Sequence, residues 1–133
     1  MTQTEGLDKV TSVEIINRDA CPPFITKDTS EIREIMAYRN SSCERMSLAE
    51  ATLYPGRHTE AHRHPRAEEV YYVLQGRGRM RVGDEARDIE GGDAILLPPG
   101  TLHQTWNTGE EPLVFLCLCA PAYEHEDTVI ERG

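Results

Sequence analysis

The sequence predicts an all-β barrel or sandwich. Much of the chain divides into short segments that alternate apolar and polar side chains, which is typical of half-buried strands. Turn residues separate these segments, as at Pro55-Gly56 and Gly83-Asp84. Helical spacing is almost absent. Many short strands divided by glycine and proline are the pattern of an all-β domain.

Two segments near the N-terminus allow more than one interpretation. Residues 10–17 are rich in β-branched side chains and predict a short strand. In residues 28–38, Ile32, Ile35 and Met36 have helical spacing, which favours a helix. The same stretch is also compatible with a turn followed by a strand.

The next strand begins at residues 60–64, and Pro65 interrupts it. His64 and Glu69 are an odd number of positions apart, so one unbroken strand would point their side chains to opposite faces. A turn after Pro65 resets the alternation. We therefore expect Glu69 to face inward, and Glu68 outward.

The remaining strands are predicted at 46–54, 76–82, 94–97, 103–107 and 113–119. In residues 76–82 the small and apolar side chains are the natural inward set. The three arginines between them then form a solvated outer face, rather than an anion-binding stripe. Residues 113–119 are apolar throughout, which predicts burial on both faces.

The chain has 133 residues, which indicates one domain with one core. A net charge of −9 argues against nucleic acid or an anionic membrane as a partner. No apolar run has the length of a membrane-spanning helix, and no secretory signal is visible. We therefore expect a cytoplasmic protein. Its four cysteines form no C-x-x-C pair and are expected to be reduced thiols: Cys21, Cys43, Cys117 and Cys119.

A candidate metal site lies in residues 56–76. His62 and His64 are one residue apart, so an extended strand points both rings to the same side. A carboxylate pair, Glu68 and Glu69, follows. Two imidazoles and a carboxylate that converge make a divalent metal site. Alone, such a histidine pair is weak support, because surface strands carry it by chance.

A second block, which begins at Gly92 and contains His103, supports the site. The two blocks resemble the two signature motifs of the cupin family. The matching positions are Gly56, His62, His64, Glu69 and Gly76 in the first motif, and Gly92, Pro98, Gly100, His103 and Asn107 in the second. The resemblance implies a cupin-type β-barrel, also called a double-stranded β-helix or jelly roll. It also favours a strand over a helix at 31–36.

The resemblance implies that four residues bind one metal ion inside the barrel: His62, His64, Glu69 and His103. Three neutral imidazoles and one carboxylate suit a divalent transition metal, namely Fe, Mn, Ni, Zn, Co or Cu. Two positions of a six-coordinate ion then stay open, as a catalytic site requires.

The same resemblance suggests boundaries and a partner. The barrel is expected at 28–123, after an extension at 1–27 and before an acidic tail at 124–133. Tyr123 is expected to lie across the barrel mouth, with a mobile tail as the alternative. Many small cupins pair an N-terminal strand with a second subunit, so residues 28–38 are the candidate contact of a homodimer. A strand on its own sheet is the alternative.

The implied chemistry is that of a metal-dependent enzyme acting on a small oxygen-rich molecule. We prefer an Fe(II) dioxygenase. One alternative is a lyase, isomerase or decarboxylase, in which the ion acts as a Lewis acid and a nearby base moves a proton. Another is a small-molecule binding protein without turnover. The candidates for the base are Tyr71, Tyr123, His58 and Glu60.

Overall fold

The computed structural model describes residues 12–131, which form strands joined by turns and two short 3-10 helices. The elements are η1 (Arg18–Ala20), β1 (Phe24–Ile25), β2 (Glu31–Met36), β3 (Ser47–Leu53), β4 (His62–Arg63), β5 (Glu68–Gln75), β6 (Arg77–Val82), β7 (Glu85–Glu90), β8 (Ala94–Leu97), β9 (His103–Asn107), β10 (Leu113–Ala120), η2 (His125–Asp127) and β11 (Val129–Ile130). None of the helices among these residues is long and apolar enough to cross a membrane.

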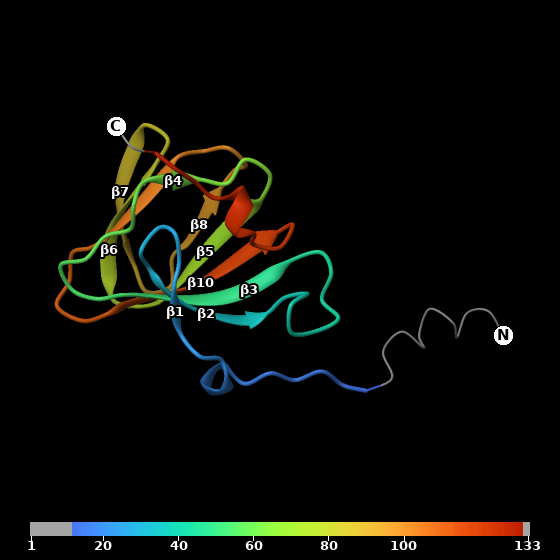
Figure 1. The fold of residues 1–133 in the computed structure, drawn as a ribbon. Coiled ribbons are helices and arrows are strands. Elements are labelled where there is room, and N and C mark those ends of the chain that lie inside the picture. The colour runs from blue at the N-terminus through green and yellow to red at the C-terminus, as the bar shows by residue number, and fades with distance from the viewer. Residues whose placement is uncertain (1–11, 132–133) are drawn as a thin grey trace.

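The strands form two antiparallel sheets that enclose one core (Figure 1). The larger sheet has the order β1-β2-β3-β10-β5-β8, and the smaller one has the order β11-β4-β9-β6-β7. This arrangement confirms the predicted all-β jelly-roll barrel. The core is built from alternate residues of the facing strands. Its buried apolar members include Leu53, Tyr71, Val73, Met80, Leu97, Leu113 and Phe115.

The strand interpretation of residues 31–36 is confirmed. β2 pairs with β1 on one side and with β3 on the other, with Ile32 opposite Ala51. Pairing with two neighbouring strands overrides the helical spacing of the apolar residues, because tertiary contacts outweigh local preference. The predicted outer face of β6 is also confirmed, since Arg79 is exposed and forms an ion pair with Asp88 at 2.8 Å.

The predicted burial of residues 113–119 on both faces is wrong. Burial alternates along β10: Leu113 and Phe115 are buried, whereas Leu118 is 38% exposed. β10 lies between β3 and β5 in the larger sheet, and only its inner face contacts the core. Its outer apolar side chains therefore lie on the surface of the chain.

The predicted strand at 10–17 is also wrong in its described part, because residues 12–17 form no strand. Residues 10 and 11 lie outside the described residues. The segment runs away from the barrel (Figure 1), and none of the strands in residues 12–131 pairs with it. Val13 and Ile15 are 81% and 83% exposed.

Both flanking segments contribute to the barrel. Phe24 and Ile25 form β1, which lies before the expected start of the barrel at residue 28. Val129 and Ile130 form β11, which pairs with β4. The acidic C-terminal segment is therefore part of the smaller sheet, because Val129 and Ile130 pair with the edge of β4 that contains His62.

Gly78 on β6 is required for the close approach of neighbouring strands. A Cβ atom at this position would meet the Trp106 carbonyl oxygen and lie 2.8 Å from Leu113 Cδ2. We predict that Gly78→Ala destabilises the protein by about 1–3 kcal/mol through overpacking. Gly91→Ala is the matched control, because its Cβ would be no closer than 3.6 Å to Leu74. Chemical denaturation checks this, and equal midpoints for the two variants would contradict it.

Candidate metal centre

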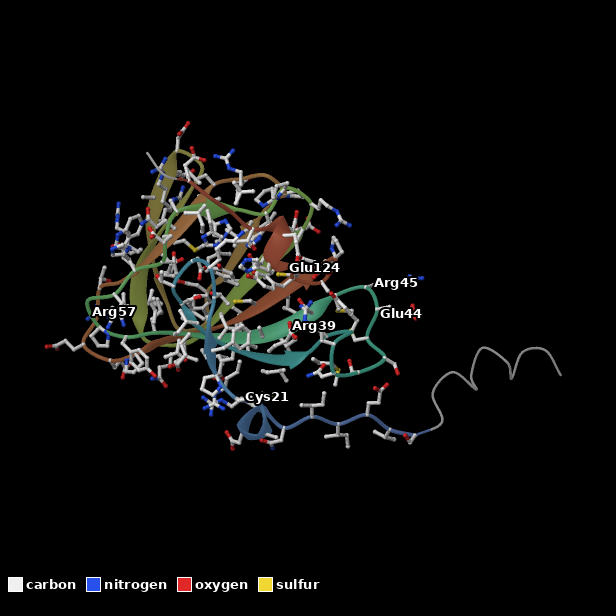
Figure 2. All side chains as sticks on the ribbon, in the orientation of Figure 1. Cys21, Arg39, Glu44, Arg45, Arg57 and Glu124 are labelled. Atoms are coloured by element: carbon white, nitrogen blue, oxygen red, sulfur yellow. The ribbon has the colours of Figure 1, made fainter. Side chains whose placement is uncertain are left out.

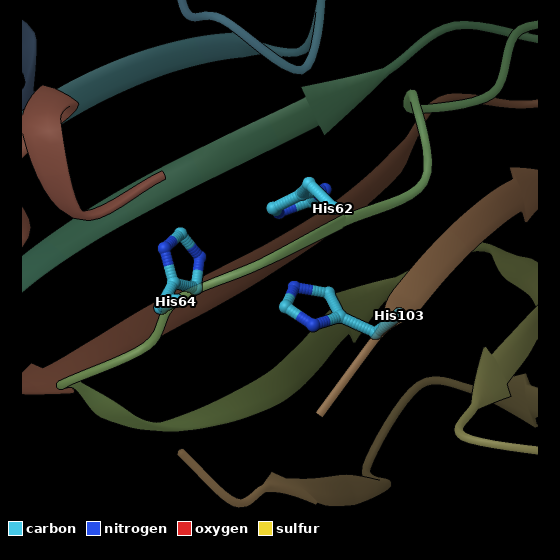
Figure 3. Close-up of side chains that lie close together, drawn as sticks. All are labelled: His62, His64 and His103. Carbon is cyan, nitrogen blue, oxygen red and sulfur yellow. The ribbon is translucent and has the colours of Figure 1, made fainter. Parts of the chain in front are cut away.

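Three buried histidines converge inside the barrel (Figure 3). His62 on β4 is the direct pairing partner of His103 at the start of β9, and His64 follows β4. One ring nitrogen from each lies within 4.8 Å of the other two. The pairing of two short strands therefore brings together residues that are 41 positions apart in the sequence.

Each ring is oriented by a hydrogen bond to the main chain. The Nδ1 atoms of His62, His103 and His64 lie 2.8, 3.2 and 3.3 Å from the carbonyl oxygens of Glu60, Thr101 and Asp127. A carbonyl oxygen only accepts, so Nδ1 donates the proton and the neutral ring presents a lone pair at Nε2. Metal-binding histidines are held in this way.

Glu69 supplies a carboxylate beside the histidines. Its Oε1 lies 3.3 Å from His64 Nε2 and 3.8 Å from His103 Nε2. Both Glu69 Oε1 and His103 Nε2 are buried without a hydrogen-bond partner among the described residues. Buried acceptors that face each other need a cation between them. The donor set therefore fits a divalent transition metal.

The turn after β4 gives Glu69 its inward direction. β4 ends at Arg63 and β5 begins at Glu68, so the intervening residues break the alternation as expected. Glu69 is buried and Glu68 is exposed. The Asp127 carboxylate accepts the backbone N–H groups of Arg66 and Ala67, both at 3.0 Å. The C-terminal segment therefore fixes this turn.

Asp28 is a second buried carboxylate at the centre, and the sequence analysis did not identify it. Its Oδ2 lies 3.3 Å from His62 Nε2. Its Oδ1 accepts the hydroxyl groups of Thr26 and Ser30, both at 2.6 Å. The sequence indicates only a turn at Asp28. The folded connection between β1 and β2 brings it to His62, which is 34 positions away in the sequence.

Burial and charge set the ionisation of the centre. Burial, together with the nearby His62, lowers the pKa of His103 to about 4. Burial also opposes the charged form of His64, but the Glu69 carboxylate outweighs it and raises the pKa of His64. Burial alone would raise the pKa of Asp28, yet His62 and the Ser30 hydroxyl lower it. At neutral pH, His103 is therefore an unprotonated ligand and Asp28 is an anion.

Of the candidate bases, only Tyr123 lines the cavity beside the histidines. Its ring centroid lies 6.0 Å from that of His64, and burial raises its pKa. Tyr71 faces inward from the core, with its ring centroid 5.9 Å from that of His103 and 4.6 Å from that of Phe115. Burial also raises its pKa well above the usual value. Tyr71 is not among the described residues that line the cavity.

The other two candidates lie differently. His58 is exposed, and its ring contacts the backbone of Thr59 instead of the centre. Glu60 contributes its carbonyl oxygen to His62. His58 does not continue the strand of His62, because residues 54–61 form a turn, an isolated bridge and irregular structure rather than one strand.

The cavity beside the centre is acidic and contains thiols. Among the described residues that line it there is no Lys or Arg, whereas Asp28, Glu34 and Glu69 are present. Cys117 and Cys119 also line it, and both thiols are free. Cys119 donates its S–H to Glu69 Oε2 at 3.0 Å. Burial, and then Glu69, raises the pKa of both thiols, so both are protonated at neutral pH.

Comparison with known proteins identifies the family. Residues 49–119 match the family model of the cupin domain. The chain belongs to the cupin family. This cupin is 44% identical over 112 residues to uncharacterized protein MJ1618 of Methanocaldococcus jannaschii, which covers 84% of this chain and 90% of the relative.

Two further relatives extend the comparison. This cupin is 30% identical to glucose-6-phosphate isomerase of Thermococcus litoralis, over 89% of this chain and 70% of the relative. Its fold resembles the polyketide cyclase RemF from Streptomyces resistomycificus with a TM-score of 0.77, over 92% of this chain and 87% of the other. Identity to RemF is 20%, so that likeness supports the fold alone.

We predict that His62→Ala and His103→Ala each abolish stoichiometric metal binding while the barrel stays folded. Removing one imidazole weakens the donor set enough to lose stoichiometric loading, whereas the core contacts remain. His58→Ala is the matched control, since His58 is exposed and away from the centre. The metal-to-chain ratio after loading checks the prediction, with circular dichroism to confirm folding. One equivalent of metal in both variants would contradict it.

Proposed function

We propose that this cupin is an enzyme that uses a divalent metal ion held by four residues: His62, His64, His103 and Glu69. The observation that carries the proposal is the pair of buried acceptors without partners, His103 Nε2 and Glu69 Oε1, beside a cavity. When bound, the ion supplies Lewis acidity to an oxygen atom of a small molecule.

We favour proton transfer between neighbouring carbons, as in an isomerase or lyase. Similarity to the glucose-6-phosphate isomerase of Thermococcus litoralis supports this class. The Fe(II) dioxygenase preferred from the sequence is the second candidate, because three imidazoles and a carboxylate also suit iron.

The cavity favours an uncharged substrate. With no Lys or Arg among its described lining residues, it offers no strong site for a phosphate group. Tyr123 remains protonated, so its hydroxyl can donate a hydrogen bond to a substrate oxygen. We therefore propose a small hydroxyaldehyde, hydroxyketone or related polyol without a phosphate.

We predict that metal-loaded protein incorporates solvent deuterium next to the carbonyl of such a compound. The metal content of unsupplemented protein is measured first, and then glyceraldehyde, dihydroxyacetone and unphosphorylated aldoses are followed by NMR in D₂O. His103→Ala should lose the exchange, and His58→Ala should keep it. Oxygen uptake without deuterium exchange would instead support the dioxygenase. Neither signal in loaded protein would indicate binding without turnover.

We also propose that this cupin forms a homodimer. β3 pairs along one side of β2, whereas on the other side β1 pairs only with Glu31 and Ile32, so among the described residues 33–36 keep an edge that a second copy could pair with. The exposed segment around Val13 and Ile15 offers apolar side chains as well. The outer face of the larger sheet offers an apolar row that follows the strand register: Leu48, Leu118, Val70 and Leu96. A second copy of the chain would cover both features.

We predict that Val13→Ser together with Ile15→Ser shifts the protein from dimer to monomer. The two changes remove apolar contact area that only a partner would bury. Val129→Ser on the other sheet, where the side chain is 44% exposed, serves as the control. Light scattering after size-exclusion chromatography measures the mass. A monomeric wild-type protein at micromolar concentration would overturn the dimer.

A further inference from the structure

We propose that Asp28 is a fifth protein ligand of the metal ion and acts as Glu69 does. The inference deepens the proposed function and rests on its metal site. Asp28 belongs to neither sequence motif. It lies in the connection between β1 and β2, and the backbone N–H of Glu60 donates to its carbonyl oxygen at 2.8 Å. This bond ties the connection to the segment that leads into β4, which carries His62.

The two carboxylates are held in the same manner. Glu69 has one oxygen anchored by a protein donor, Cys119, and the other oxygen directed at histidine nitrogens. Asp28 has Oδ1 anchored by the Thr26 hydroxyl and by the hydroxyl and backbone N–H of Ser30. Its Oδ2 receives no hydrogen bond from the described residues and is directed at His62. Each acid therefore presents one free oxygen to the centre.

The contact between Asp28 and His62 requires a cation. His62 Nδ1 lies 2.8 Å from the Glu60 carbonyl oxygen, which only accepts, so a ring without a proton on Nε2 turns a lone pair toward the carboxylate. Two acceptors at 3.3 Å repel each other unless a proton or a metal ion lies between them. His64 Nε2 and Glu69 Oε1 are also 3.3 Å apart. Each carboxylate thus has one oxygen beside one of the three imidazoles whose nitrogens lie within 4.8 Å of one another, and would hold an ion from that side.

A fifth ligand changes the character of the site. Two carboxylates neutralise the charge of a divalent ion, whereas Glu69 alone leaves it positive. They also reduce the open positions of a six-coordinate ion to one. A neutral centre with one open position would bind a single oxygen of an uncharged molecule. This agrees with the lack of Lys and Arg among the described residues that line the cavity.

The chain offers a matched control for charge. Glu34 lines the same cavity, but both of its carboxylate oxygens accept hydrogen bonds from Arg39, at 2.8 and 2.7 Å. Arg39 is labelled in Figure 2. Glu34→Gln therefore removes one negative charge from the cavity without removing a donor to the ion. Asp28→Asn keeps an oxygen for Thr26 and Ser30, so the connection retains its hydrogen bonds. Asp28→Glu keeps the charge but displaces the carboxylate.

The test is titration of metal-free protein with Co²⁺, followed by the visible absorption of the ion. We expect Asp28→Asn and Asp28→Glu to raise Kd by at least about tenfold and to shift the absorption bands, and we expect the same of Glu69→Gln. Glu34→Gln should have a Kd for Co²⁺ and absorption bands close to those of the wild type. Melting curves of the metal-free variants confirm that each is folded. Wild-type Kd and bands in folded Asp28→Asn would overturn the proposal.

This experiment uses no substrate, so it separates the two proposals. Weaker binding in the Asp28 variants, together with no turnover in the wild type, would support Asp28 as a ligand and overturn the enzymatic function. Turnover in the wild type with unchanged metal binding in Asp28→Asn would support the enzymatic function and overturn Asp28 as a ligand. Wild-type protein that binds no Co²⁺ would overturn both.

Discussion

Hydrogen bonds from Nδ1 to backbone carbonyls orient all three imidazoles, so main-chain atoms set the direction of every ligand nitrogen. Glu60, Thr101 and Asp127 supply these carbonyls from three separate parts of the chain. Their relative positions depend on the pairing of β4 with β9 and with β11. The ligand nitrogens therefore converge only when these strands of the smaller sheet have paired. The metal centre thus forms at the same time as the barrel closes.

The same burial that holds the ligands also prepares their charge. His103 has a pKa lowered to about 4, so it requires no proton release at neutral pH. Asp28 stays anionic in spite of burial because hydroxyl groups and His62 stabilise its charge. Cys119 is protonated and donates to Glu69 rather than competing for the ion. The cavity thus concentrates negative charge and lone pairs at one point, where a divalent cation is the natural counter-ion.

Local alternation and motif spacing were sufficient to predict the parts of the site that lie on strands. The shared face of His62 and His64, the reset at Pro65 and the inward direction of Glu69 follow from period-two geometry. Asp28 and Asp127 were missed because their contacts cross between segments far apart in the sequence. Residues 113–119 were misjudged for another reason: a wholly apolar strand carries no signal that separates its inner face from its outer face.

The contribution of the C-terminal segment has a consequence for biosynthesis. His64 Nδ1 lies 3.3 Å from both the Asp127 carbonyl and the Thr128 hydroxyl. On the ribosome, the ring of His64 has no oriented position until residues 127 and 128 have emerged from the exit tunnel. An ion bound at this centre would therefore be acquired after translation of the barrel. Metal supply at that moment, as well as ligand chemistry, would then determine which element the centre holds.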